Sequence, residues 1–195
     1  MELDAATLIM AIAALSGFYM AWNIGANDVA NAMGTSVGSG ALTLRGAIIV
    51  AAIFEFGGAL LVGGSVTSTI KNGIVDMSYF VGEAEEFALG MTCCLLAAAL
   101  WLNLASWRGW PVSTTHSIVG AVVGFGIVGG GFAAVQWGKM GVIAASWVVS
   151  PLLGGLVAFT LFRILQKTVL DTEAPVKALR IMGPFMIAPI FFVLT

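Results

Sequence analysis

The chain has 195 residues, of which 59% are hydrophobic and only 9% are charged, and its formal net charge at pH 7 is −2. A soluble domain carries roughly 25% charged residues, so this chain cannot cover a globular surface with polar groups. No basic patch indicates a nucleic-acid partner, and no motif indicates a cofactor. We therefore predict an all-α, polytopic integral membrane protein surrounded by the lipid bilayer.

A membrane-spanning helix needs about 20 apolar residues. The runs that meet this length are, in chain order, Ala5–Ile24, Gly46–Ile70, Phe87–Trp107, Val112–Phe132 and Gly141–Leu165, the last interrupted by Ser150 and Pro151. A further apolar run begins at Met182 and is too short to span, which indicates a helix truncated at the end of the chain. The domain prediction is a transmembrane repeat over 1–165, a cytoplasmic loop over 166–181 and the start of a truncated helix over 182–195.

The charged residues between the runs predict the orientation, because Lys and Arg favour the cytoplasmic side of a membrane. Glu2 and Asp4 precede the first run without any Lys or Arg, so we expect a retained helix and not a secretory signal. If the runs alternate across the membrane, Lys71 and Lys139 fall on the side of the N-terminus. On the other side fall Arg45, Arg108, Arg163, Lys167, Lys177 and Arg180. We predict a multi-pass protein of the plasma (inner) membrane with its N-terminus outside.

The segment 87–132 has two possible arrangements. It can form two full spans that meet at the cytoplasm, or a re-entrant hairpin whose tip, residues 107–111, lies deep in the membrane. The hairpin would bring Ser113–Ser117 toward the midplane, where the binding sites of transporters tend to lie.

A first polar motif, Gly25–Ala32, places a carboxylate and two carboxamides in an apolar run. On a helix, Asn27, Asn31 and Thr35 share one face, with Asp28 beside them, and Gly25 can supply a break in the helix. Hydrogen bonding between helices would explain the Asn residues. An ionisable group in a membrane is costly, and packing does not require one, so the motif favours a ligand or ion site.

A second polar motif, Pro111–Ser117, begins another apolar run. Pro111 suits the first turn of a helix, and Ser113, Thr114 and Thr115 would then lie in that turn. Backbone N–H groups, hydroxyls and the positive end of the helix dipole would converge there, which is typical of an anion site. Helix capping by Ser and Thr is the alternative.

Three single residues complete the candidate site. Glu55 lies about ten residues into its run, roughly 15 Å along a helix and near mid-bilayer, where it needs a proton, a cation or a partner from another helix. His116, the only histidine, is interpreted as a supporting residue more readily than as a proton relay. Arg108 is a cytoplasmic anchor, or, in the hairpin arrangement, a partner for a carboxylate or a bound anion.

The two motifs together resemble the inorganic phosphate transporter (Pit) family of sodium- or proton-coupled phosphate symporters. The matching residues are Gly25–Ser39 and Pro111–Ala121. The resemblance implies two inverted repeats, of which this chain supplies the N-terminal one, with broken helices or a re-entrant hairpin. It also implies that the C-terminal repeat of the same protein completes the site.

The resemblance further implies roles for the candidate residues. Phosphate would be bound by Asn27, Asp28, Asn31, Ser113, Thr114 and Thr115. Cation coupling would involve Asp28, Glu55 and Asn31, with sodium at Asp28 and Glu55 if sodium is the coupling ion, and His116, Thr35 and Arg108 would support the site.

The predicted function is phosphate import by sodium or proton symport with alternating access, in a protein able to form homo-oligomers. Moving a dianion into a negative interior costs roughly 4.6 kcal/mol per 100 mV, so two cations would cancel that cost and a third would drive uptake. The alternatives are a symporter of another oxyanion such as sulfate, and a channel or structural subunit. A hydrolase that uses Ser113 or Ser117 with His116 is disfavoured, because neighbouring helical residues point apart; we predict no enzyme activity.

Overall fold

The computed structural model describes residues 4–82 and 84–194, without the side chains of 65, 66, 69–72 and 189–194. Glu2 and the side chain of Lys71, which entered the orientation prediction, lie outside the described residues. The α-helices are α1 (Ala5–Gly38), α2 (Leu44–Gly73), α3 (Ala84–Arg108), α4 (Thr114–Gly130), α5 (Trp137–Leu165) and α6 (Pro175–Leu194). Short helical segments are η1 (Met77–Phe80), η2 (Phe132–Ala134) and the π-helical η3 (Gln166–Leu170).

Local hydrogen bonds explain where several helices begin and end. The carboxylate of Asp4 accepts from the Ala6 N–H at the start of α1, and the hydroxyl of Thr43 accepts from the Gly46 N–H at the start of α2. Gly109, with φ +69°, ends α3: its N–H donates to the Ser106 carbonyl, and the Trp110 N–H donates to the Ala105 carbonyl. This pair of bonds is the Schellman arrangement, in which glycine adopts the left-handed conformation after the last helical residue.

The helical membrane architecture predicted from composition is confirmed. The helices long and apolar enough to cross a membrane among the described residues are α1, α2, α3 and α5, the last with its extension to Leu170. α4 is also apolar but shorter, with 17 residues. Large apolar side chains are exposed along these helices, as expected of helices that face lipid or other membrane helices. The chain is therefore an integral membrane protein.

Two predicted breaks are wrong, because α1 continues through Gly25 and α5 continues through Pro151. A glycine in a helix costs about 1 kcal/mol, whereas backbone groups left unpaired in lipid cost several kcal/mol each. Staying helical is therefore favoured at Gly25. Membrane helices also tolerate proline within their length. α6 begins at Pro175 rather than Met182, so the predicted loop over 166–181 is largely helical.

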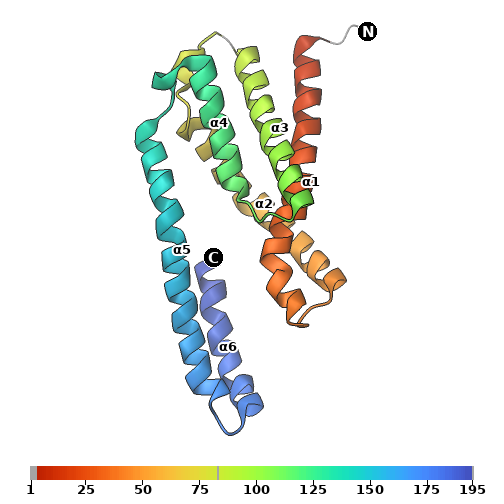
Figure 1. Cartoon of the computed structure of the whole chain (residues 1–195), viewed down its shortest axis with the longest axis vertical. Helices are drawn as coiled ribbons and strands as arrows, with labels where there is room; N and C mark the ends of the chain where they lie inside the picture. Colours follow the sequence, from red (N-terminus) through yellow and green to blue (C-terminus); the bar gives the residue numbers. More distant parts are fainter. Residues whose placement is uncertain (1–3, 83, 195) are drawn as a thin grey trace. The chain divides into compact units, whose positions relative to one another are not determined.

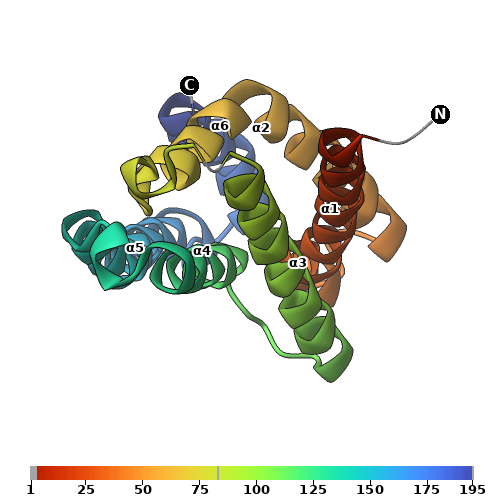
Figure 2. The same cartoon turned by 90° about the horizontal axis from the view of Figure 1, so that it is seen from above.

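The chain forms two compact units, residues 1–140 and 141–195, which are described separately. In the first unit α3 packs on both α1 and α4 (Figures 1 and 2). Met20 of α1 meets Ala98, Ala99 and Leu102 of α3 in a buried cluster. Small residues such as these alanines let membrane helices approach closely.

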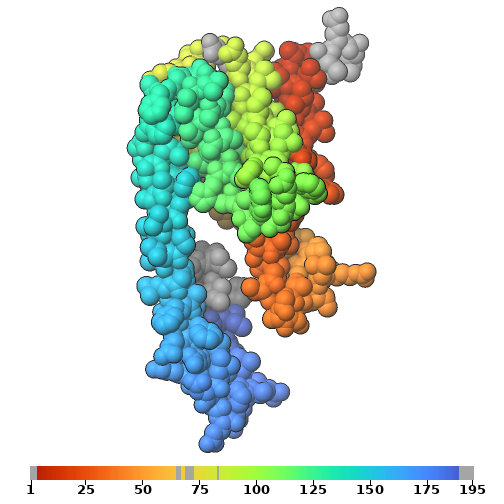
Figure 3. All heavy atoms as spheres, in the orientation of Figure 1, coloured from red at the N-terminus to blue at the C-terminus, as the bar shows by residue number. Residues whose placement is uncertain are grey.

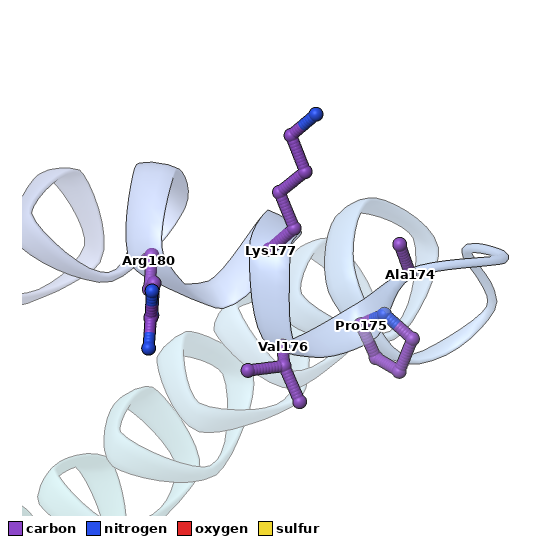
Figure 4. Close-up of a pocket in the computed structure, with 5 residues that line it drawn as sticks. All are labelled: Ala174, Pro175, Val176, Lys177 and Arg180. Carbon is purple, nitrogen blue, oxygen red and sulfur yellow. The ribbon is translucent and has the colours of Figure 1, made fainter.

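The second unit contains most of α5, η3 and α6. Val169 of η3 is buried, and Arg163 donates to the side-chain oxygen of Gln166 at 3.1 Å. A shallow hollow lies at the start of α6, where Lys177 and Arg180 extend in different directions (Figure 4). These two positive charges therefore do not converge on a shared anion site.

Candidate functional site

The two polar motifs meet in the structure. The Thr114 hydroxyl of α4 donates to the carboxylate of Asp28 on α1, with 2.8 Å from Oγ1 to each carboxylate oxygen. The two residues are 86 positions apart in sequence, and both are half-buried. The predicted association of the first motif with the second is thus present as a direct hydrogen bond.

Asn27 makes a second connection between α1 and the segment that leads into α4. Its side chain is only 4% exposed, and Nδ2 donates to the Trp110 carbonyl at 3.3 Å and to Ser106 Oγ at 3.4 Å. Its Oδ1 accepts from Asn31 Nδ2 at 3.3 Å, one helical turn further along α1. Asn31 itself is exposed.

The start of α4 differs in detail from the prediction. Pro111 lies outside the helix, and Ser113 is the capping residue, whose Oγ accepts from the His116 N–H at 3.3 Å. The capping alternative is therefore correct for Ser113. Thr115 is exposed, and its hydroxyl makes no hydrogen bond to the described part of the chain. A first helical turn with an unengaged hydroxyl remains a suitable place for an anion.

A hollow of about 340 Å³ lies between α1 and the turn that joins α3 to α4. Small residues of α1, Ala26 and Ala30, leave room for it, and Asn27, Asn31 and Ser106 bring polar groups to it; Gly109, Trp110 and Pro111 complete the lining. Asp28 does not line this hollow, because the neighbouring residue on a helix points about 100° away. The polar groups of α1 thus serve two adjacent faces.

The depth of the α3–α4 turn bears on the two arrangements of segment 87–132. The turn touches α1 at Asn27, and α1 continues from Asp28 to Gly38, which is roughly 15 Å further along the helix axis. Figure 3 shows the turn, in green, against the body of α1 and not at its end. α4 has 17 residues, about 25 Å, and is short for a full span. These dimensions favour the re-entrant hairpin.

Arg108 lies at this turn and contacts aromatic rings. Its guanidinium carbon is 5.3 Å from the centre of the Trp107 ring and 5.5 Å from that of Trp110. A cation over an indole face is attracted by the ring quadrupole. Within the described ranges no carboxylate forms an ion pair with Arg108, so the predicted carboxylate partner is not found in this part of the chain.

The other predicted residues are less closely connected. Glu55 is exposed on α2, and no hydrogen bond or ion pair joins it to Asp28 among the described side chains. Thr35 and His116 are exposed on α1 and α4. The described residues bring no three of His, Cys, Asp and Glu together as ligands for a metal ion.

Sequence reasoning missed Ser106 and the Trp110 carbonyl, the two acceptors for Asn27. Ser106 belongs to neither motif and lies in the last turn of α3. The available signal was its position just before Gly109, because a polar residue beside a helix-ending glycine marks a turn at which backbone carbonyls need partners.

These features define a polytopic α-helical membrane protein with a polar site where a short helix begins against a long one. Residues 24–195 match the family model described as the Phosphate transporter family, and the chain belongs to that family.

The relatives and a solved structure agree with this assignment. The chain is 54% identical over 170 residues to the protein named "Inorganic phosphate transporter 2-1, chloroplastic" of Arabidopsis thaliana, covering 87% of this chain and 29% of that protein. It also resembles a solved structure titled "The sodium-dependent phosphate transporter", with a TM-score of 0.82, 45% identity, and coverage of 88% of this chain and 42% of the other. The chain spans less than half the length of these relatives.

Proposed function

We propose that this chain forms the N-terminal repeat of an importer that carries inorganic phosphate together with a cation by alternating access. The observation that carries the proposal is the hydrogen bond from Thr114 to Asp28, which joins the family's two polar motifs in one site. A second, inverted repeat of the same protein would supply the rest of the binding site and the surface against which this repeat moves.

Sodium is the coupling cation we favour, since the similar solved structure is of a transporter titled sodium-dependent. Asp28 carries the negative charge that a cation requires, with Asn31 as a neighbouring amide and Glu55 as a second carboxylate from α2. Phosphate would lie at the start of α4, where Thr115, Ser113 and the backbone N–H groups of the first turn face the positive end of the helix.

Coupling follows from the single proton of the Thr114 hydroxyl. In the described conformation that proton is donated to Asp28, so it is not available to an anion. A cation bound to Asp28 would replace the hydroxyl as the partner of the carboxylate, and Thr114 could then donate to phosphate. The cation also removes the repulsion between phosphate and Asp28, which is strong in a medium of low dielectric constant. Cation binding would thus precede phosphate binding.

The membrane placement completes the proposal. The protein would lie in the plasma (inner) membrane with its N-terminus outside and the basic segment 163–180 in the cytoplasm, as the positive-inside rule favours. The α3–α4 hairpin would be re-entrant and would hold the start of α4 near the midplane, as in transporters whose half-helix ends face the substrate.

Uptake of labelled phosphate by proteoliposomes tests the proposal, using the gene product that carries this chain. We expect an imposed sodium gradient to drive saturable uptake and Asp28→Asn to abolish it while membrane insertion is preserved, because the amide removes the charge that holds the cation. Asp171→Asn, at an exposed position of the turn before α6, is the matched control and should transport normally.

Each outcome of this experiment is informative. Undiminished uptake by Asp28→Asn would contradict the proposed site. Uptake driven only by a proton gradient would replace sodium by protons at Asp28 and Glu55. Sulfate transport in place of phosphate transport would retain the mechanism and change the substrate.

A further inference from the structure

We infer that Ser106 is a positioning residue, which with Asn27 clamps the α3–α4 turn onto α1 and thereby holds Thr114 against Asp28. Ser106 lies in neither polar motif. The effect we expect on transport rests on the proposed function, whereas the effect on the turn itself does not.

The turn is held tightly at its beginning and less regularly afterwards. The bonds from the Gly109 and Trp110 N–H groups to the carbonyls of Ser106 and Ala105, at 3.1 and 2.8 Å, complete α3. Residues 110–113 are not helical. This stretch leads directly into Thr114, so what holds it determines where α4 begins.

Asn27 is well placed to hold this stretch. One amide nitrogen, buried on α1, donates both to Ser106 Oγ in the last turn of α3 and to the Trp110 carbonyl at the start of the irregular stretch. Both amide protons of Asn27 are therefore engaged by the turn, and its oxygen accepts from Asn31. A side chain engaged in this way fastens two segments together and has no proton left to donate to phosphate, which revises the predicted role of Asn27.

The clamp and the candidate site are adjacent on both segments. Asn27 precedes Asp28 on α1, and Trp110 lies only a few residues before Thr114. A shift of the turn relative to Asn27 consequently changes the distance from Thr114 to Asp28, which is 2.8 Å in the structure. Hydrogen bonds of this length weaken steeply with misalignment, and small displacements of positioned groups reduce the rates of coupled reactions strongly.

Ser106 is the part of the clamp that can be removed without touching the proposed ligands. Ser106→Ala leaves one buried N–H of Asn27 without its acceptor, which is costly, and Ser106→Thr retains the hydroxyl beside a hollow that can receive the added methyl group. Thr92→Val is the matched control: Thr92 is also buried on α3, but its hydroxyl donates to the Ala88 carbonyl of its own helix at 2.7 Å.

Hydrogen exchange, measured by mass spectrometry on the whole gene product in nanodiscs, tests the clamp directly. We expect the amides of 109–116 to exchange about three- to tenfold faster in Ser106→Ala, the change that follows from the net loss of about one hydrogen bond. Ser106→Thr should remain close to the wild-type rate, and Thr92→Val should leave this segment unchanged. Wild-type exchange in Ser106→Ala, or equal acceleration in Thr92→Val, would overturn the clamp.

Phosphate uptake then tests the positioning role. We expect Ser106→Ala to raise the KM for phosphate and for sodium about three- to tenfold, with Vmax per folded protein within about twofold, and Ser106→Thr to restore both. A lower Vmax with unchanged KM values would mean that Ser106 only supports folding, and would overturn the inference. If the wild-type protein transports no phosphate, the proposed function fails, while hydrogen exchange still decides the clamp. Should Ser106→Ala not fold, Ser106→Cys, whose thiol is a weaker acceptor, takes its place in both measurements.

Discussion

The two ends of the α3–α4 hairpin are held by different kinds of interaction. At the end away from the turn, the rings of Phe80, Phe87 and Phe125 lie with centres 5.2 to 5.8 Å apart. There the Asp76 N–H donates to the Ala134 carbonyl and the Gln136 N–H to the Ile74 carbonyl, both at 2.8 Å, around an isolated bridge between Val75 and Val135. At the turn end, by contrast, the contacts with α1 are the polar bonds of Asn27 and Asp28.

The difference between these ends indicates which one can respond to a ligand. Interdigitated rings and fully buried Ala134 cannot separate without losing many contacts at once. A hydrogen bond contributes only about 0.5–1.5 kcal/mol net and can be exchanged for a bond to a ligand. The aromatic end therefore serves as the anchor of the hairpin, and the turn end is where cation and phosphate can change the contacts with α1.

The largest expected effect is at the aromatic end. A Cβ at Gly90 would overlap the ring of Phe125, and overpacking of this kind costs roughly 3 kcal/mol at the upper end of its range. The better helix propensity of alanine returns about 1 kcal/mol. Gly90→Ala should thus destabilise the protein by about 2 kcal/mol, measured as a lower midpoint of thermal unfolding in detergent.

Gly17→Ala is the matched control for this change, since a Cβ there would meet Leu95 at an ordinary 3.7 Å. It should be neutral or stabilising by up to about 1 kcal/mol. If both variants unfold at the wild-type temperature, the aromatic end is not the rigid part of the hairpin.

The next effect is at the turn end and concerns activity. Thr114→Val removes the hydroxyl that bonds Asp28, so the first motif loses its partner in the second. We expect a loss of about tenfold in the Vmax/KM of phosphate uptake, equivalent to about 1.4 kcal/mol, with thermal stability near that of the wild type. Thr114→Ser should recover most of the uptake.

Thr160→Val controls for the loss of a hydroxyl as such, because Thr160 donates to the Leu156 carbonyl of its own helix at 2.8 Å. Equal losses in Thr114→Val and Thr160→Val would show that the bond to Asp28 has no special part in transport. Strong unfolding of Thr114→Val would instead remove the proposed contrast between an anchoring end and a responsive end.

Most of the fold follows from the sequence because lipid requires every backbone group to be satisfied within a helix. Long apolar runs consequently identify the helices, and capping residues such as Asp4 and Ser113 set where some of them begin. The same requirement explains the errors at Gly25 and Pro151. Glycine and proline usually interrupt helices in water, where exposed backbone groups find partners, but an interruption in lipid is far more costly.

The site was predictable in its chemistry and not in its contacts. A carboxylate in one apolar run and hydroxyls at the start of another each need polar partners, and Asp28 and Thr114 become each other's partner. Which residues of the α3–α4 turn meet Asn27 depends on how far α3 extends along α1, which periodicity does not encode. Ser106 was missed for this reason, and Glu55, expected beside Asp28, is exposed on α2 without a described hydrogen bond to it.

The smallest expected effect concerns Asp76, at the aromatic end and outside the spanning helices. The N–H and then the hydroxyl of Ser78, followed by the charge of Lys139, lower the pKa of Asp76 below its ordinary value, against a small opposing effect of burial. Because the folded pKa lies below the unfolded one, the ionised carboxylate stabilises the cap of η1 above about pH 4 and loses this contribution as the pH falls through the folded value.

Asp76→Asn should therefore weaken the η1 segment slightly at neutral pH and remove part of the acid dependence of its local opening. Hydrogen exchange of residues 76–81, compared between about pH 6 and pH 3 after correction for intrinsic rates, measures both quantities. The segment is followed alone because Asp76 is fully exposed and its effect on global unfolding is small. An acid dependence that is identical in the variant and the wild type would mean that the aromatic end is anchored by its ring and backbone contacts alone, which would make the contrast with the polar turn end more complete.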